Sequence, residues 1–160
     1  TELIQTKYPK DYLAVIKFGD RAERIPLAEL PYLQAGPFHT NTREALQVAR
    51  AILERRKQPN RQIFLITDGK PSCIREYGRL YKNPFGLDPK IVNKTLEEAA
   101  WLRKKRITVT TFMLAVDAPL LEFVRKLTEI NQGRIYETDP QNVGTYVFRD
   151  FVRNRRKRLH

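Results

Sequence analysis

The chain has 160 residues, of which 41% are apolar and 30% are charged, a composition typical of one globular domain. Cys73 is its one cysteine, which excludes an intrachain disulfide framework and a cysteine-rich zinc site. No apolar run approaches about 18 residues, which excludes a membrane-spanning helix, and no signal-peptide pattern opens the chain. We therefore expect a cytoplasmic location, the alternative being an export signal upstream of Thr1.

The net charge of +12 is concentrated near the carboxyl terminus. Residues 149–160 carry six Lys and Arg against one acidic residue, which is a net +5. The smaller clusters at 55–57 and 103–106 fall where helices are predicted to end, and cations there complement the helix dipole. Only the terminal cluster therefore calls for a functional interpretation.

The first half of the chain alternates short apolar runs with one clear helix. Residues 1–8 are typical of the end of a helix that Pro9 stops. Apolar runs predict strands at 12–18 and 63–66. A more polar edge strand is predicted at 21–27, where Pro26 removes a ladder donor, and a loop at 28–39. Asn41 and Glu44 have capping-box spacing and predict the start of a helix that closes at 58–60.

The second half continues the alternation. We predict a long loop at 70–89, followed by helices at 89–105, 120–132 and 143–158. Strands are predicted at 107–115 and 134–136, with Gly133 as the C-cap of the helix before the second one. This order favours one α/β domain over 1–160, a three-layer, doubly wound, mainly parallel sheet with helices on both faces.

Ligand sites in such folds lie beyond the carboxyl ends of the strands. Two segments are predicted to reach that edge, 39–42 before a helix and 65–72 after a strand. Thr40 offers a hydroxyl and Asp68 a carboxylate, hard oxygen ligands that suit Mg²⁺, Mn²⁺ or Ca²⁺ better than zinc.

These motifs resemble those of a von Willebrand factor type A (VWA) domain. Thr-Asn-Thr precedes a helix at 40–42, and Thr-Asp-Gly ends an apolar strand at 67–69, with Asp68 lying 28 residues after Thr40. Residues 136–150, which read YETDPQNVGTYVFRD, are similar to the ending of the bacterial, intracellular branch of that family. The resemblance covers essentially the whole chain and implies a Rossmann-like fold.

The resemblance also implies a metal-ion-dependent adhesion site. Such a site takes an Asp-x-Ser-x-Ser motif from the loop after the first strand, a Thr that matches Thr40 and an Asp that matches Asp68. The implied function is Mg²⁺- or Mn²⁺-dependent binding of a protein partner that presents an acidic residue, an AAA-type ATPase being the implied partner class. On this interpretation the chain is a binding module and not an enzyme.

The chain departs from the family pattern at its start. Ser72 is the one serine, so Asp-x-Ser-x-Ser is absent. The family's first strand, expected between the strands at 12–18 and 63–66, is absent as well. We therefore expect an N-terminally truncated domain in which the gap between these strands leaves sheet edges unpaired. With two of five ligands, this chain is expected to bind metal weakly or not at all.

Other interpretations remain open for several residues. Thr42 and Asp117 fit helix capping, His39 fits a loop, and Cys73 fits an ordinary thiol because it lacks a general base. The main alternative function is binding of nucleic acid or an anionic surface through the basic terminal stretch, Arg153, Arg155, Arg156, Lys157 and Arg158.

Overall fold

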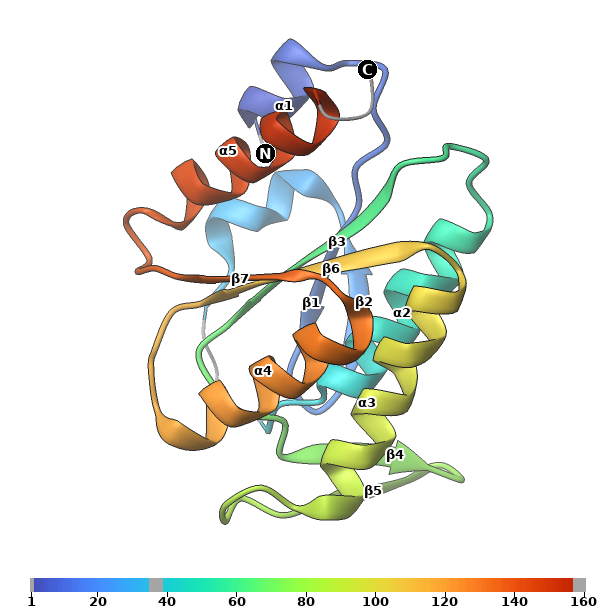
Figure 1. Ribbon diagram of the computed structural model, residues 1–160, viewed down its shortest axis with the longest axis vertical. Coiled ribbons are helices and arrows are strands. Elements are labelled where there is room, and N and C mark those ends of the chain that lie inside the picture. The colour runs from blue at the N-terminus through green and yellow to red at the C-terminus, as the bar shows by residue number, and fades with distance from the viewer. Residues whose placement is uncertain (1, 35–38, 157–160) are drawn as a thin grey trace.

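A parallel sheet of three strands forms the centre of the molecule (Figure 1). The computed structural model describes residues 2–34 and 39–156. The strands are β3 (Arg61–Thr67), β6 (Ile107–Met113) and β7 (Arg134–Glu137), in the order β3-β6-β7. Thr67 is paired with Met113 and Met113 with Glu137, so the three strands end at one edge of the sheet.

Helices cover both faces of this sheet, as the alternation predicted. Figure 1 shows α1 (Glu2–Lys7) and α5 (Val143–Arg156) together on one side and the other three helices on the opposite side. The rings of Tyr8, just after α1, and Phe151 of α5 make an edge-to-face contact with centroids 5.2 Å apart. The other three helices are α2 (Thr42–Glu54), α3 (Pro89–Lys104) and α4 (Ala118–Asn131).

The main core lies between the sheet and α2, α3 and α4. Alternate residues of β6 point into it, including Ile107, Val109 and Met113, because successive side chains of a strand face opposite sides. The other buried members of this core are Leu46, Leu65, Val92, Ala99, Leu102, Leu120, Phe123, Val124 and Leu127. The intervening β6 residue Phe112 faces α5 instead, where its ring stacks on that of Tyr136.

A second, two-stranded antiparallel sheet contains β1 (Val15–Phe18) and β2 (Ala22–Ile25). Among the described residues, β1 is hydrogen-bonded only to β2, and β3 only to β6. No backbone ladder therefore joins β1 to β3 within the described residues. A 3-10 helix at Leu27–Tyr32 occupies most of the described part of the segment predicted as a loop over 28–39.

The prediction of a loop over 70–89 is wrong in part. Residues Cys73–Glu76 (β4) and Arg79–Lys82 (β5) form an antiparallel hairpin. Tyr77 and Gly78, with φ of 50° and 75°, make its two-residue turn. The hairpin escaped prediction because Cys73 and Ile74 are adjacent and both buried, so the sequence lacks the alternation of a half-buried strand.

The prediction that Gly133 caps α4 is also wrong. Gln132 takes the left-handed conformation there, with φ of 58°. Position 133 requires glycine because the backbone of β6 lies close to it. A Cβ at this position would be 1.7 Å from the carbonyl oxygen of Val109. Beside it, the buried Asn131 accepts a hydrogen bond from the N–H of Val109 (2.8 Å) and donates to the carbonyls of Ala99 (3.2 Å) and Ile107 (3.1 Å). The end of α4 is thus fixed against both α3 and β6.

We predict that Gly133→Ala destabilises the fold by about 3 kcal/mol or more, because the added methyl group must displace the backbone of β6. The free energy of unfolding from urea denaturation measures the effect. Gly144→Ala is the matched control. A Cβ at Gly144, in the first turn of α5, has no atom within 4 Å, and the change should stabilise the protein by up to about 1 kcal/mol. Equal stability of the two variants would contradict the close approach.

Candidate functional site

Three loops meet beyond the carboxyl ends of β1 and β3. The N–H of Asn41 donates to the carbonyl of Gly19 (2.8 Å), and the side-chain amide of Asn41 donates to the carbonyl of Asp20 (3.0 Å). The N–H of His39 donates to the Asp20 carboxylate (2.8 Å). The segment before α2 is therefore fastened to the turn that follows β1.

The same segment is fastened to the loop after β3 through Ser72. The N–H of Thr40 donates to the Ser72 hydroxyl (2.9 Å), and the N–H of Ser72 donates back to the Thr40 carbonyl (3.0 Å). The Ser72 hydroxyl also lies 3.3 Å from Nδ1 of His39. The sequence identified Ser72 only as a serine in the wrong place, because no local pattern indicates a bond between residues 32 positions apart.

This arrangement brings the two predicted ligands to one corner of the molecule. A Cβ at Gly69 would lie 3.6 Å from the Thr40 hydroxyl oxygen, so the Thr40 side chain faces the backbone next to Asp68. Asp68 is exposed and has no hydrogen bond or ion pair with any described residue. Its backbone is shaped by Thr67, whose hydroxyl donates to the Gly69 carbonyl (3.0 Å). The carboxylate is therefore available to a ligand.

The neighbouring polar groups fit their structural interpretations. Asn41 caps α2 by accepting from the N–H of Glu44 (3.0 Å), which confirms the predicted cap. The Glu44 carboxylate accepts from the Asn41 side-chain amide and not from its backbone N–H, which is bound to Gly19, so the capping box is not complete. Thr42 is buried in the first turn of α2. Asp117 caps α4 by accepting from the N–H of Leu120 (2.7 Å).

The residues present fit a metal shell only in part. Thr40 and Asp68 offer two oxygen ligands, while the next carboxylate, Asp20, is held by the N–H of His39. In the described ranges, no group of three or more His, Cys, Asp or Glu side chains is placed to hold a metal ion. The carboxyl edge therefore provides oxygen ligands for a hard cation, but too few of them to surround it.

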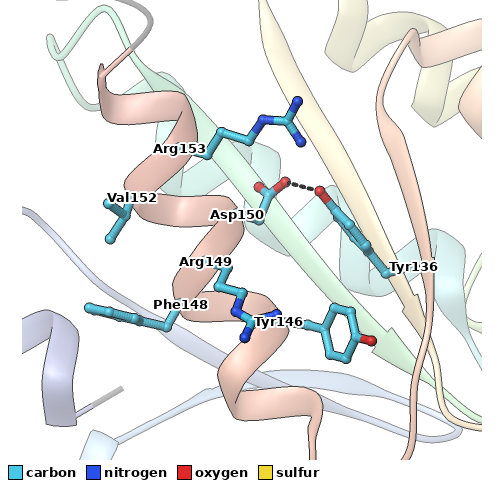
Figure 2. A pocket seen from close by; sticks show the side chains of 7 residues that line it. All are labelled: Tyr136, Tyr146, Phe148, Arg149, Asp150, Val152 and Arg153. Atoms are coloured by element: carbon cyan, nitrogen blue, oxygen red, sulfur yellow. Dashed lines mark hydrogen bonds between the residues drawn. The ribbon is translucent and has the colours of Figure 1, made fainter.

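A separate pocket of about 600 Å³ lies between β7 and α5 (Figure 2). Its lining includes the aromatic rings of Tyr136, Tyr146 and Phe148. Asp150 is buried beside it and accepts hydrogen bonds from the Tyr136 hydroxyl (2.9 Å) and from Arg134 (2.7 and 2.8 Å). Burial, followed by this hydrogen bond to Asp150, raises the pKa of Tyr136 above its ordinary value. Asp150 thus anchors α5 to the sheet.

The basic terminal stretch is only partly available for an anion. Arg155 forms an ion pair with Asp11, and its guanidinium lies over the Tyr8 ring, 4.6 Å from the centroid. Arg153 is exposed at the rim of the pocket, one turn after the exposed Arg149. The side chain of Arg156, and the whole of Lys157 and Arg158, lie outside the described residues.

Cys73 is buried beneath these loops, at the start of the hairpin. Burial raises the pKa of its thiol to about 11, and the nearby Asp20 adds to the shift. The thiol is therefore protonated at neutral pH. Since the thiolate is the nucleophile in cysteine chemistry, Cys73 is a structural residue and not a reactive one.

No helix in the described part of the chain combines the length and the hydropathy needed to cross a bilayer.

Comparison with known proteins identifies relatives over nearly the whole chain. Residues 1–152 match the family described as "Rv0959-like protein, vWA domain". The uncharacterized proteins Rv0959 of Mycobacterium tuberculosis (strain H37Rv) and Mb0984 of Mycobacterium bovis are each 29% identical to it over 161 residues, which is 97% of this chain and 24% of their own length. The chain thus spans about a quarter of the curated relatives that it matches.

Two solved structures share the fold. The protein BatB from Bacteroides thetaiotaomicron has a TM-score of 0.60 at 16% identity, with 98% of this chain and 86% of BatB covered. The SpRpn10 VWA domain has a TM-score of 0.55 at 12% identity, with 87% of this chain and 70% of that chain covered. These similarities establish an α/β fold of VWA type with a parallel central sheet.

We predict that Cys73 reacts slowly with Ellman's reagent in the folded protein at about pH 8, because the buried thiol stays protonated below its raised pKa. The rate should increase as the pH rises toward about 11. In guanidinium chloride the pKa returns to about 8.5 and the reaction should be fast. Absorbance of the released thiolate follows both rates. Equal rates in folded and unfolded protein at about pH 8 would contradict the burial of Cys73.

Proposed function

The chain belongs to the Rv0959-like family of VWA domains, and on that premise we propose that it is a metal-dependent protein-interaction module and not an enzyme. The observation that carries the proposal is the meeting of Thr40 with an exposed, unpartnered Asp68 at the carboxyl edge of the sheet. This is the edge at which α/β folds bind ligands.

Thr40 and Asp68 would hold Mg²⁺ or Mn²⁺ through one hydroxyl and one carboxylate oxygen. When bound, the ion supplies the positive charge that attracts an acidic residue of a partner protein. Water or the acidic residue of the partner would complete the shell. The partner class implied by the resemblance to bacterial, intracellular VWA domains is an AAA-type ATPase. Because the chain covers only 24% of the relative Rv0959, the activity and partners of a protein of that full length are part of the same proposal.

The chain's own residues have two tasks in this function. Ser72 holds the Thr40 backbone on the loop after β3, and Thr67 shapes the turn that presents Asp68. Neither bond requires an ion. The two oxygen ligands are therefore positioned before any metal arrives, which reduces the entropic cost of binding it.

We predict that Mn²⁺ binds this 160-residue chain with a dissociation constant in the millimolar range, because two protein oxygens leave most of the shell to water. Asp68→Asn should abolish the binding, since it removes the one charged ligand. Electron paramagnetic resonance of free Mn²⁺ measures the bound fraction. Glu129→Gln, which removes an exposed carboxylate of α4, is the control and should bind as the parent chain does. Micromolar affinity, or affinity that survives Asp68→Asn, would overturn the metal assignment.

A second candidate function is polyanion binding by α5. Arg149 and Arg153 are exposed one turn apart, have no acidic partner among the described residues and adjoin an aromatic pocket. This arrangement favours contact with phosphates of nucleic acid or of an anionic surface. The engagement of Arg155 by Asp11 reduces the number of free cations and makes this function second to the first.

If α5 binds polyanions, single-stranded oligothymidylate should bind with an affinity that falls steeply as salt rises, and deletion of 153–160 should abolish it. Each lost phosphate contact makes the negative slope of log K against log salt shallower by about 0.7, so Arg149→Gln with Arg153→Gln should reduce its magnitude by about 1.4. Fluorescence anisotropy gives the slope. Binding with no salt dependence, or with an unchanged slope in the double variant, would exclude this function.

A further inference from the structure

The β4–β5 hairpin is attached to the candidate site. Its base is the loop that carries Asp68, and Ser72 in this loop bonds both to Thr40 and, through its carbonyl, to the N–H of Asn83 after β5 (2.9 Å). The ammonium group of Lys70 donates to the carbonyl of Pro84 (3.0 Å), which ties the loop after β5 to the residues next to Asp68. Figure 1 shows the hairpin beyond the helix layer, at the end of the molecule where α3 begins.

The inner part of the hairpin is fixed in place. Cys73 and Ile74 are fully buried. Glu76 bridges Arg43 of α2 (3.8 Å) and Lys90 of α3 (3.0 Å). The Tyr81 hydroxyl donates to the carboxylate of Asp88, the cap of α3 (2.8 Å). The hairpin is therefore a rigid projection of the domain.

The outer part of the hairpin presents aromatic rings and unpaired cations. Tyr77 is fully exposed at the turn, and Phe85 is 83% exposed in the loop that follows β5. Between them, the side chains of Arg79 and Lys82 are exposed and have no hydrogen bond or ion pair with a described residue. The acidic residues of the segment, Glu76 and Asp88, are already engaged. The free charge of this surface is therefore positive.

The turn itself indicates that the Tyr77 side chain serves a partner. Two-residue turns with positive φ at both positions favour Asn followed by Gly, and a tyrosine in the left-handed region carries an energetic cost. No contact within the described residues repays this cost, because the ring is wholly exposed. Residues that break a local rule in this way are expected at functional positions.

We infer that β4–β5 and the loop to Phe85 form a docking arm for an acidic segment of a partner protein, with Arg79 and Lys82 binding its carboxylates and Tyr77 and Phe85 packing against its apolar side chains. Tyrosine and arginine are the residues that dominate protein interfaces. A protein is favoured over nucleic acid because the hairpin offers only Arg79 and Lys82 to phosphates, whereas the basic stretch that begins in α5 continues in the sequence to Arg158. The inference rests on the proposed function only in taking the partner to be acidic.

The test measures fluorescence anisotropy of a short fluorescein-labelled peptide that repeats Asp-Glu-Phe, with EDTA present so that no metal contributes. We expect saturable binding that Arg79→Gln with Lys82→Gln weakens about tenfold, because both carboxylate contacts are lost. Lys10→Gln with Arg125→Gln makes the same charge change at exposed positions elsewhere, and should change the affinity less than about twofold.

A second variant separates binding from folding. Tyr77→Asn should weaken peptide binding about fivefold while raising the urea midpoint, since asparagine suits the turn better. A loss of binding caused by misfolding would lower the midpoint instead. Phe85→Ala, at an exposed position with no packing to lose, should weaken binding to a similar extent.

Three results would overturn the inference: absence of peptide binding, equal affinity in the hairpin variants and the parent chain, or tighter binding of oligothymidylate through the same residues. Repeating the titration with Mn²⁺ and with Asp68→Asn distinguishes the two proposals. Dependence on Asp68 and Mn²⁺ without dependence on the hairpin would keep the proposed function and reject the docking arm. Dependence on the hairpin in EDTA, with no change in affinity on adding Mn²⁺ or on Asp68→Asn in the presence of Mn²⁺, would keep the docking arm and reject the metal-dependent function.

Discussion

The reciprocal hydrogen bonds between Thr40 and Ser72 join two sheets that share no backbone ladder. In most parallel sheets, neighbouring strands fix one another's carboxyl ends. Here β1 and β3 lack that mutual constraint, so the loops beyond them carry it, with Asn41 holding the turn after β1 and Ser72 holding the loop after β3. The relative placement of Thr40 and Asp68 depends on these few bonds and on the packing of α2 over β1.

The chemistry of the site depends on the polar groups that these hydrogen bonds leave unpaired. Backbone groups and the hydroxyl of Ser72 satisfy one another, and the Asp20 carboxylate is held by His39. What remains outward is one hydroxyl, from Thr40, and one carboxylate, from Asp68. The pair provides ligand oxygens, while the thiol of Cys73 nearby is buried and protonated. These two oxygen ligands support the proposed role in recognition.

Most of the fold and the two ligand candidates could be predicted from the sequence, because both depend on local signals. The cap at Asn41 and the apolar periodicity of α3 and α4 act within one helix, and Asp68 follows a strand whose centre, residues 63–66, is apolar. The prediction failed where the cause is distant. Gly133 is required by the Val109 carbonyl across the sheet, and Ser72 serves a residue 32 positions away. The hairpin was not predicted for a third reason. Cys73 and Ile74 are buried on opposite faces of the strand, so the sequence lacks the alternation of apolar and polar residues that indicates a strand.

The free cations on the hairpin also affect the order of events in an encounter. Charge acts over about 8 Å at physiological ionic strength, whereas coordination to a metal ion held by oxygen ligands requires contact. Arg79 and Lys82 therefore influence an approaching acidic chain earlier than Thr40 and Asp68 do. Exposed charges of this kind chiefly change association rates, while desolvated contacts chiefly change residence times. In this domain the projecting hairpin would chiefly set the association rate, and the carboxyl edge of the sheet would chiefly set the residence time.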